Sequence, residues 1–84
     1  MTIEPSAWRT NDSEVFDLAR DAVGYLIALL LDLARSGALD TEAATDESRR
    51  FRSDLLEAGF DRARINQLLA KVEARAAELE GPRQ

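Results

Sequence analysis

The apolar residues between Asp12 and Ser36 recur at helical spacing and lie on almost every side of the helix that they predict. One apolar seam has a 4-3 spacing and consists of Val15, Ala19, Ala22, Leu26, Leu29 and Leu33. A second seam lies beside it, is interrupted by Arg20, and consists of Phe16, Val23, Ile27, Leu30 and Ala34. Because a helix that is apolar nearly all round is normally buried, this pattern predicts a long central helix at about residues 12–36.

On the side of this helix that neither seam covers, the residues in the middle are small rather than charged. Gly24 and Ala28 lie one turn apart there, and no charged residue occurs from Ala22 to Leu31. This small-x-x-x-small spacing allows a second backbone to approach closely, although it is best known from membrane helices. The alternative is a tolerated glycine on an exposed face, at a cost of about 1 kcal/mol relative to alanine.

Two shorter helices are predicted in the second half, at about residues 45–58 and 61–80. Gly37 ends the first helix, and Thr41 and Thr45 are both candidates to start the next one. Gly59 and Asp61 indicate a very short turn between the two later helices, with Phe60 packing on Leu55 in a Schellman stop. The apolar residues of these helices recur on one side each: Ala44, Phe51, Leu55 and Ala58, then Ile65, Leu68, Leu69, Val72, Ala76 and Leu79.

The predicted architecture is therefore all-α, a dimeric three-helix bundle in a single helical domain of residues 12–80. Residues 1–11 contain Pro5 and lack periodicity, which predicts a flexible tail, and Gly81 and Pro82 begin a C-terminal tail of residues 81–84. Trp8 has two interpretations. Its ring either folds back to cover one end of the bundle or is an anchor for a partner pocket, since Trp is enriched at binding hot spots.

The amino-acid composition limits the kinds of catalytic and metal-binding site that the chain can form. The chain has 84 residues with no Cys and no His, which removes disulfides and the imidazole and thiolate ligands of metal sites. A domain of this size is marginally stable alone, so oligomerisation or docking on a partner is the remaining way to stabilise it. Asp17 and Asp21 are one turn apart, a spacing that could suit a metal site or an acid/base pair. Acidic residues are also favoured in the early turns of a helix by its dipole, which explains this pair without such a site. We expect no enzymatic activity, no cofactor and no metal.

The charge is unevenly distributed. The net charge is -5, with ten acidic residues and three arginines up to Glu47 (net -7), and six acidic and eight basic residues from Ser48 onwards (net +2). The two halves should attract, within one chain or between two, with the later arginines pairing with carboxylates of the first helix. The acidic balance argues against general binding to nucleic acid or anionic lipid. The apolar run is also far shorter than the about 20 residues of a membrane span.

These patterns favour a small acidic interaction protein (an adaptor, regulator or inhibitor) in a cytoplasm. The abundance of Ala and Arg with a single Lys further suggests a bacterial one. We expect a homodimer, a larger protein partner, or both. Two long helices would pack antiparallel, either through the seam with Ala22, Leu26, Leu29 and Leu33 or through Gly24 and Ala28. The predicted interface residues are Ala22, Gly24, Leu26, Ala28, Leu29, Leu33 and Trp8.

The alternative is a helix-turn-helix-like nucleic-acid-binding regulator. A tight turn between the later helices is the arrangement that such readers use, with the second helix entering the major groove. The residues that would contact nucleic acid, or a protein partner, are Arg49, Arg50, Arg52, Arg62 and Arg64.

Overall fold

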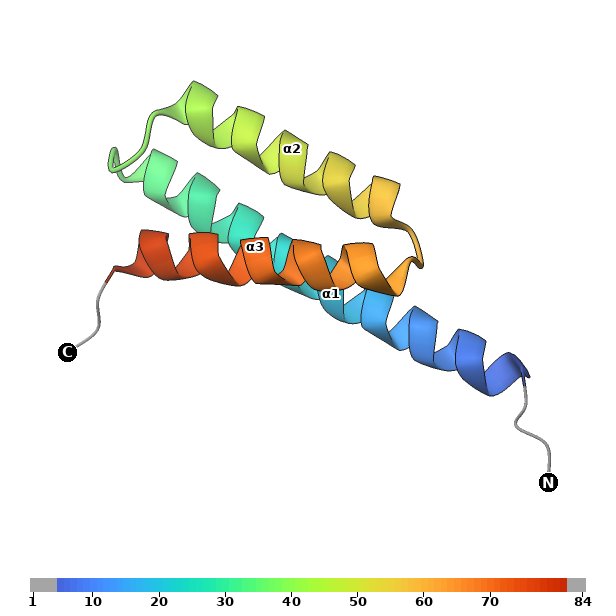
Figure 1. Cartoon of the computed structure of the whole chain (residues 1–84). Helices are drawn as coiled ribbons and strands as arrows, with labels where there is room; N and C mark the ends of the chain where they lie inside the picture. The colour runs from blue at the N-terminus through green and yellow to red at the C-terminus, as the bar shows by residue number, and fades with distance from the viewer. Residues whose placement is uncertain (1–4, 82–84) are drawn as a thin grey trace.

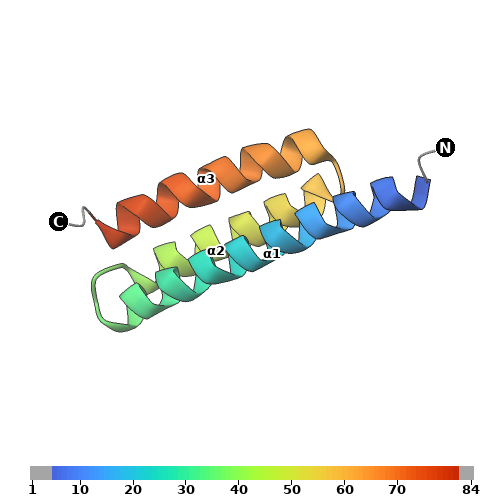
Figure 2. The ribbon, with the colours of Figure 1, turned by 90° about the horizontal axis from the view of Figure 1, so that it is seen from below.

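Three helices pack against one another in the computed structural model, which describes the backbone of residues 5–81 and the side chains of residues 14–81. They are α1 (Pro5–Arg35), α2 (Thr41–Ala58) and α3 (Arg62–Glu80). The two shorter helices run antiparallel to each other, and α1 lies against both of them (Figures 1 and 2). The all-α class and the arrangement of one long helix with a two-helix hairpin are thus confirmed.

Helix α1 begins earlier than the sequence pattern predicts. It starts at Pro5, whereas the start was expected near Asp12, so the helix includes most of the segment predicted to be a flexible tail. The physical reason is that proline is favoured at the first helical position, because the backbone N–H that it lacks would have no acceptor within the helix there. As a result, α1 extends beyond the hairpin at its N-terminal end (Figure 1). The side chain of Trp8 lies outside the described residues.

The connection between α1 and α2 contains a Schellman stop, which the sequence pattern predicted at Gly59; there the Gly59 N–H donates to the Leu55 carbonyl at 3.2 Å instead, the single bond of the simpler αL stop. Gly37 has a φ of 88°, and its N–H donates to the Ala34 carbonyl at 3.1 Å while the N–H of Ala38 donates to the Leu33 carbonyl at 2.9 Å. These are the two bonds that define the motif. Asp40 then caps α2, because its carboxylate accepts a hydrogen bond from the N–H of Ala43 at 3.0 Å. Helix α2 therefore begins at Thr41, earlier than the predicted residue 45.

The turn between α2 and α3 is as short as predicted. Gly59 ends α2 with a φ of 53°, and the carboxylate of Asp61 caps α3 by accepting from the N–H of Arg64 at 3.2 Å. The ring of Phe60 meets Phe16 of α1 edge to face, with 5.2 Å between ring centroids. Phe60 thus links the hairpin turn to α1 by an aromatic contact.

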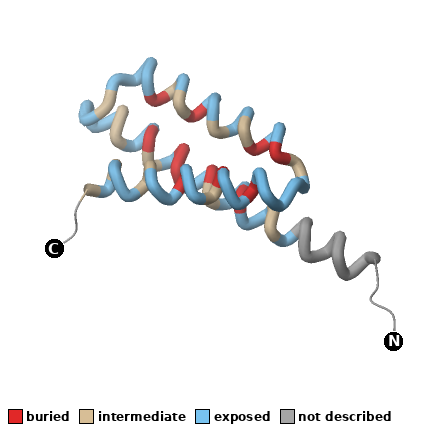
Figure 3. Tube along the Cα trace, in the orientation of Figure 1, coloured by how far each residue is buried: buried red, intermediate tan, exposed pale blue. Residues whose placement is uncertain are grey.

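The hydrophobic core lies where the three helices meet, and its buried residues form one stripe on each helix (Figure 3). Leu26, Leu30 and Ile65 are its largest fully buried side chains. Among the residues whose side chains are described, the buried core consists of Ala19, Val23, Leu26, Ile27 and Leu30 from α1, Ala44, Leu55 and Ala58 from α2, and Ile65, Leu68 and Val72 from α3. Burial of each large aliphatic side chain contributes about 1.5–3 kcal/mol, so this stripe accounts for much of the stability of the bundle.

Candidate interaction surfaces

The side of α1 that faces away from the hairpin remains partly apolar. We call it the outer face and define it by Gly24, Tyr25, Ala28 and Leu31. Tyr25 is 56% and Leu31 39% exposed, and Gly24 and Ala28 are exposed as well. A shallow depression runs over the C-terminal half of this face and is lined by Tyr25, Ala28, Leu29, Leu31, Asp32 and Arg35.

The sequence left open whether two α1 helices would pack through the seam that contains Leu26 or through Gly24 and Ala28, and the structure distinguishes these two possibilities. Leu26 is completely buried in the core, so in this fold it has no surface to offer to a partner. The other members of its seam, Ala22, Leu29 and Leu33, are half-buried. By contrast, Gly24 and Ala28 are exposed, so the expectation of an apolar contact through α1 now depends on the outer face.

Tyr25 and Leu31 are the members of the outer face that sequence reasoning missed. Both are apolar residues that belong to neither of the two apolar seams. Their position outside the seams could have shown that a further side of the helix is apolar. The hydroxyl of Tyr25 donates a hydrogen bond to the carboxylate of Glu80 at the end of α3. This bond holds the tyrosine ring at the border between the outer face and α3.

The arginines predicted to contact a partner are all exposed, and Arg49 and Arg64 pair with acids close by in sequence. Arg49 lies 3.3 Å from Asp46 within α2. Arg64 lies 4.0 Å from the capping carboxylate of Asp61 and donates to the carbonyl of Glu57 at 3.4 Å. These partners belong to the hairpin, whereas carboxylates of α1 were expected. Exposed pairs of this kind contribute about 0–1 kcal/mol each.

Arg50 lies with Arg49 at a shallow depression that is also lined by Asp46 and Ser53. Two acidic or hydroxyl side chains therefore accompany the two arginines at this place on α2. Arg52 and Arg62 are exposed, and Arg62 makes further contacts of its own. The five predicted arginines thus all lie exposed on the hairpin, and acidic side chains accompany Arg49, Arg50 and Arg64.

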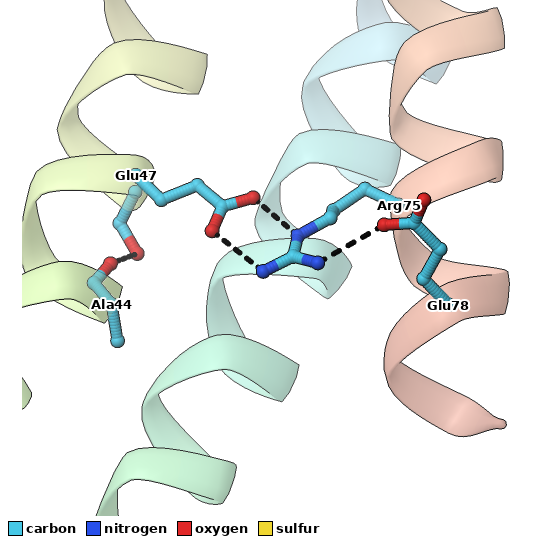
Figure 4. Close-up of polar contacts among 5 residues, drawn as sticks. Ala44, Glu47, Arg75 and Glu78 are labelled. Carbon is cyan, nitrogen blue, oxygen red and sulfur yellow. Dashed lines mark hydrogen bonds and ion pairs between the residues drawn. The ribbon is translucent and has the colours of Figure 1, made fainter. Parts of the chain in front are cut away.

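A stronger ion pair joins the two helices of the hairpin, and sequence reasoning did not identify it. Arg75 of α3 donates to both carboxylate oxygens of Glu47 of α2, at 2.5 and 3.0 Å, and to Glu78 of its own helix at 3.0 Å (Figure 4). The side chains of Arg75 and Glu47 are only 31% and 20% exposed. These hydrogen bonds, first to Glu47 and then to Glu78, raise the pKa of Arg75 above its ordinary value. The bridge fixes α2 and α3 against each other.

Neither a metal site nor a membrane span occurs in the described part of the chain. Within it, no group of three or more acidic, His or Cys side chains is arranged to hold a metal ion. No helix there has both the length and the hydrophobicity needed to cross a membrane. Comparison of the whole chain with protein-family models, curated proteins and solved structures found no match.

Proposed function

We propose that this protein is a small acidic, non-enzymatic interaction module of the cytoplasm that self-associates through the outer face of α1. The observation that carries the proposal is the exposed apolar surface there. Tyr25 and Leu31 are 56% and 39% exposed on a stretch of α1 without charged residues. A larger protein that docks on the same face, helped by the arginines of the hairpin, is the second form of this function.

The energetics support a contact between helices on this face. A large apolar side chain contributes about 1.5–3 kcal/mol when it passes from full exposure to full burial, so Tyr25 and Leu31, which are 56% and 39% exposed, would each contribute part of that on association. Gly24 adds to the argument. A methyl group at this position would meet nothing within 4 Å in the described chain beyond its own helical turn. The fold of the single chain therefore gives no reason for a glycine here, whereas a closely approaching second helix would.

Light scattering on a sizing column, over a dilution series, tests the proposal. We expect the wild type to have the mass of a dimer, and Ala28→Glu and Leu31→Glu to have the mass of a monomer while keeping the helical circular dichroism spectrum. Glutamate is a good helix former, so these changes should break the contact and leave α1 intact. The matched control is Leu56→Glu, because Leu56 is 74% exposed on α2, away from the outer face.

A control variant that dissociates as readily as Ala28→Glu would show that another surface makes the contact. A wild type that stays monomeric at every concentration would contradict self-association altogether.

The geometry of the hairpin does not favour the nucleic-acid alternative. Helices of a helix-turn-helix cross at about 90–120°, whereas α2 and α3 run back along each other (Figures 1 and 2). Arg64, at the start of the helix that would read the groove, is engaged by Asp61 and by the carbonyl of Glu57. A duplex-DNA mobility shift at low salt, with Arg64→Ala as the comparison, tests this alternative directly.

A further inference from the structure

Two opposite charges lie at the two ends of the outer face. Asp21 comes seven residues before Ala28 and Arg35 seven residues after it, and both side chains are exposed. Seven residues are about two helical turns at 3.6 residues per turn, so both charges are on the same side of α1 as Ala28. The outer face therefore carries Asp21 toward one end and Arg35, next to Asp32, toward the other, with the small residue Ala28 midway between them.

We propose that a second copy of the chain occupies the outer face, with the two α1 helices antiparallel and the two-fold axis at Ala28. This inference rests on the proposed function. In an antiparallel pair, residues equally far from the axis in opposite directions face each other. Asp21 of each copy thus meets Arg35 of the other, and the same ion pair forms at both ends. Tyr25 lies at the level of Leu31 of the second copy, and the two Ala28 residues meet at the axis.

The charges distinguish this arrangement from its parallel counterpart. Two parallel helices in register would place Asp21 against Asp21 and Arg35 against Arg35, and like charges across an interface disfavour the pairing. Arg35 can accept the new partner. Its present bond to Asp32 is long, at 3.5 Å, and both side chains are at least three-quarters exposed. A guanidinium has five N–H donors, so Arg35 can bind Asp21 of the second copy while it keeps Asp32.

A charge exchange tests the pairing. Asp21→Arg and Arg35→Asp each replace both interface ion pairs by like charges, so we expect each variant alone to associate at least about tenfold more weakly than the wild type. An equimolar mixture of the two variants should form a one-to-one heterodimer, because each contact then joins an arginine to an aspartate. Native mass spectrometry measures the three species directly. Rescue on mixing is not expected from an effect on the folding of either chain.

A second measurement tests the position of the axis without changing a charge. The chain contains no cysteine, so Ala28→Cys introduces its only thiol. A disulfide needs Cα atoms about 4.4–6.8 Å apart, a separation that two helices reach when small residues meet at their contact. On mild oxidation we expect rapid covalent dimer formation by Ala28→Cys and slow formation by the matched control Leu56→Cys.

The outcomes separate this inference from the proposed function. A wild type that dimerises and is dissociated by Ala28→Glu, but whose two charge variants show no preference for each other, would overturn the antiparallel pairing and leave the interaction surface standing. Equal oxidation rates of the two cysteine variants would likewise overturn the position of the axis. A monomeric wild type would overturn both proposals. Weaker association of each charge variant alone, recovery in the mixture and rapid cross-linking at position 28 would together support the antiparallel pair. In a parallel pair Asp21 already faces Asp21 and Arg35 faces Arg35, so neither variant alone would associate more weakly than the wild type.

Discussion

The inner and outer faces of α1 differ in how much of their apolar surface the hairpin covers. The inner face, with Leu26 and Leu30, is completely buried against the hairpin, whereas the outer face leaves Tyr25 and Leu31 partly exposed. Both faces come from the same uncharged stretch, Ala22 to Leu31. Two helices of 18 and 19 residues cover only one side of a 31-residue rod. The folded chain therefore buries the apolar residues of the inner face and leaves part of the apolar surface of the outer face exposed.

Truncation of one leucine on each face gives the largest expected effect and the most direct test of the contrast. Leu26→Ala should lower the free energy of unfolding by about 2–5 kcal/mol, because it leaves a cavity in the core. Leu31→Ala should change it by less than about 1 kcal/mol in dilute solution, because this side chain is already partly solvated. Urea unfolding at a concentration where the chain is monomeric measures both. Equal losses would mean that the two faces do not differ in this way.

The sequence predicted much of the fold because its signals are local. The 3-4 spacing of Ile65, Leu68 and Val72 identifies the buried side of α3, and Gly37, Gly59 and Asp61 mark helix ends at the positions observed. The start of α1 was wrong because a proline reads equally well as a helix breaker and as a first helical residue. Of the two predicted starts of α2, Thr41 and Thr45, the helix begins at Thr41, and the residue that caps it, Asp40, was not predicted.

The candidate surface was harder to predict because it depends on which side of α1 the hairpin covers. Two apolar seams on one helix give no indication of which is inside, so Leu26 was assigned to an interface although it is the centre of the core. Arg75 and Glu47 are 28 residues apart, and their pairing depends on the register between α2 and α3. No local pattern encodes that register, so the bridge had no signal in the sequence.

Removal of the ion pair between Arg75 of α3 and Glu47 of α2 should lower the free energy of unfolding of the bundle, although neither residue belongs to the buried core. Arg75→Met keeps most of the aliphatic side chain and removes the bonds to Glu47 and Glu78, and hydrogen bonds to charged groups contribute about 1.5–3 kcal/mol. Because this pair is partly exposed, we expect a loss of about 1–2 kcal/mol. Thermal unfolding followed by circular dichroism measures it. Arg49→Met, which removes an exposed pair with Asp46, is the matched control and should cost much less.

The pH dependence of this effect has a defined sign. Pairing raises the pKa of Arg75, so the stability that comes from this shift is complete below the ordinary pKa of arginine and is lost only as the pH rises through the higher, folded-state pKa. The difference between wild type and Arg75→Met should therefore stay constant from neutral to mildly alkaline pH. A difference that disappears over this range would show that the charge of Arg75 is not its source.

The smallest change tests the contrast most sharply, because it should move folding and association in opposite directions. Gly24→Ala removes a helix-interior glycine and should raise the free energy of unfolding of the monomer by about 1 kcal/mol, since the added methyl group meets nothing nearby within the described chain. The same methyl group would keep a second helix at a distance, so the dimer should dissociate more readily. Dilute urea unfolding measures the first effect and a light-scattering dilution series the second. A variant that is more stable and equally dimeric would show that Gly24 is simply a tolerated glycine, and the contact would then have to lie elsewhere on α1.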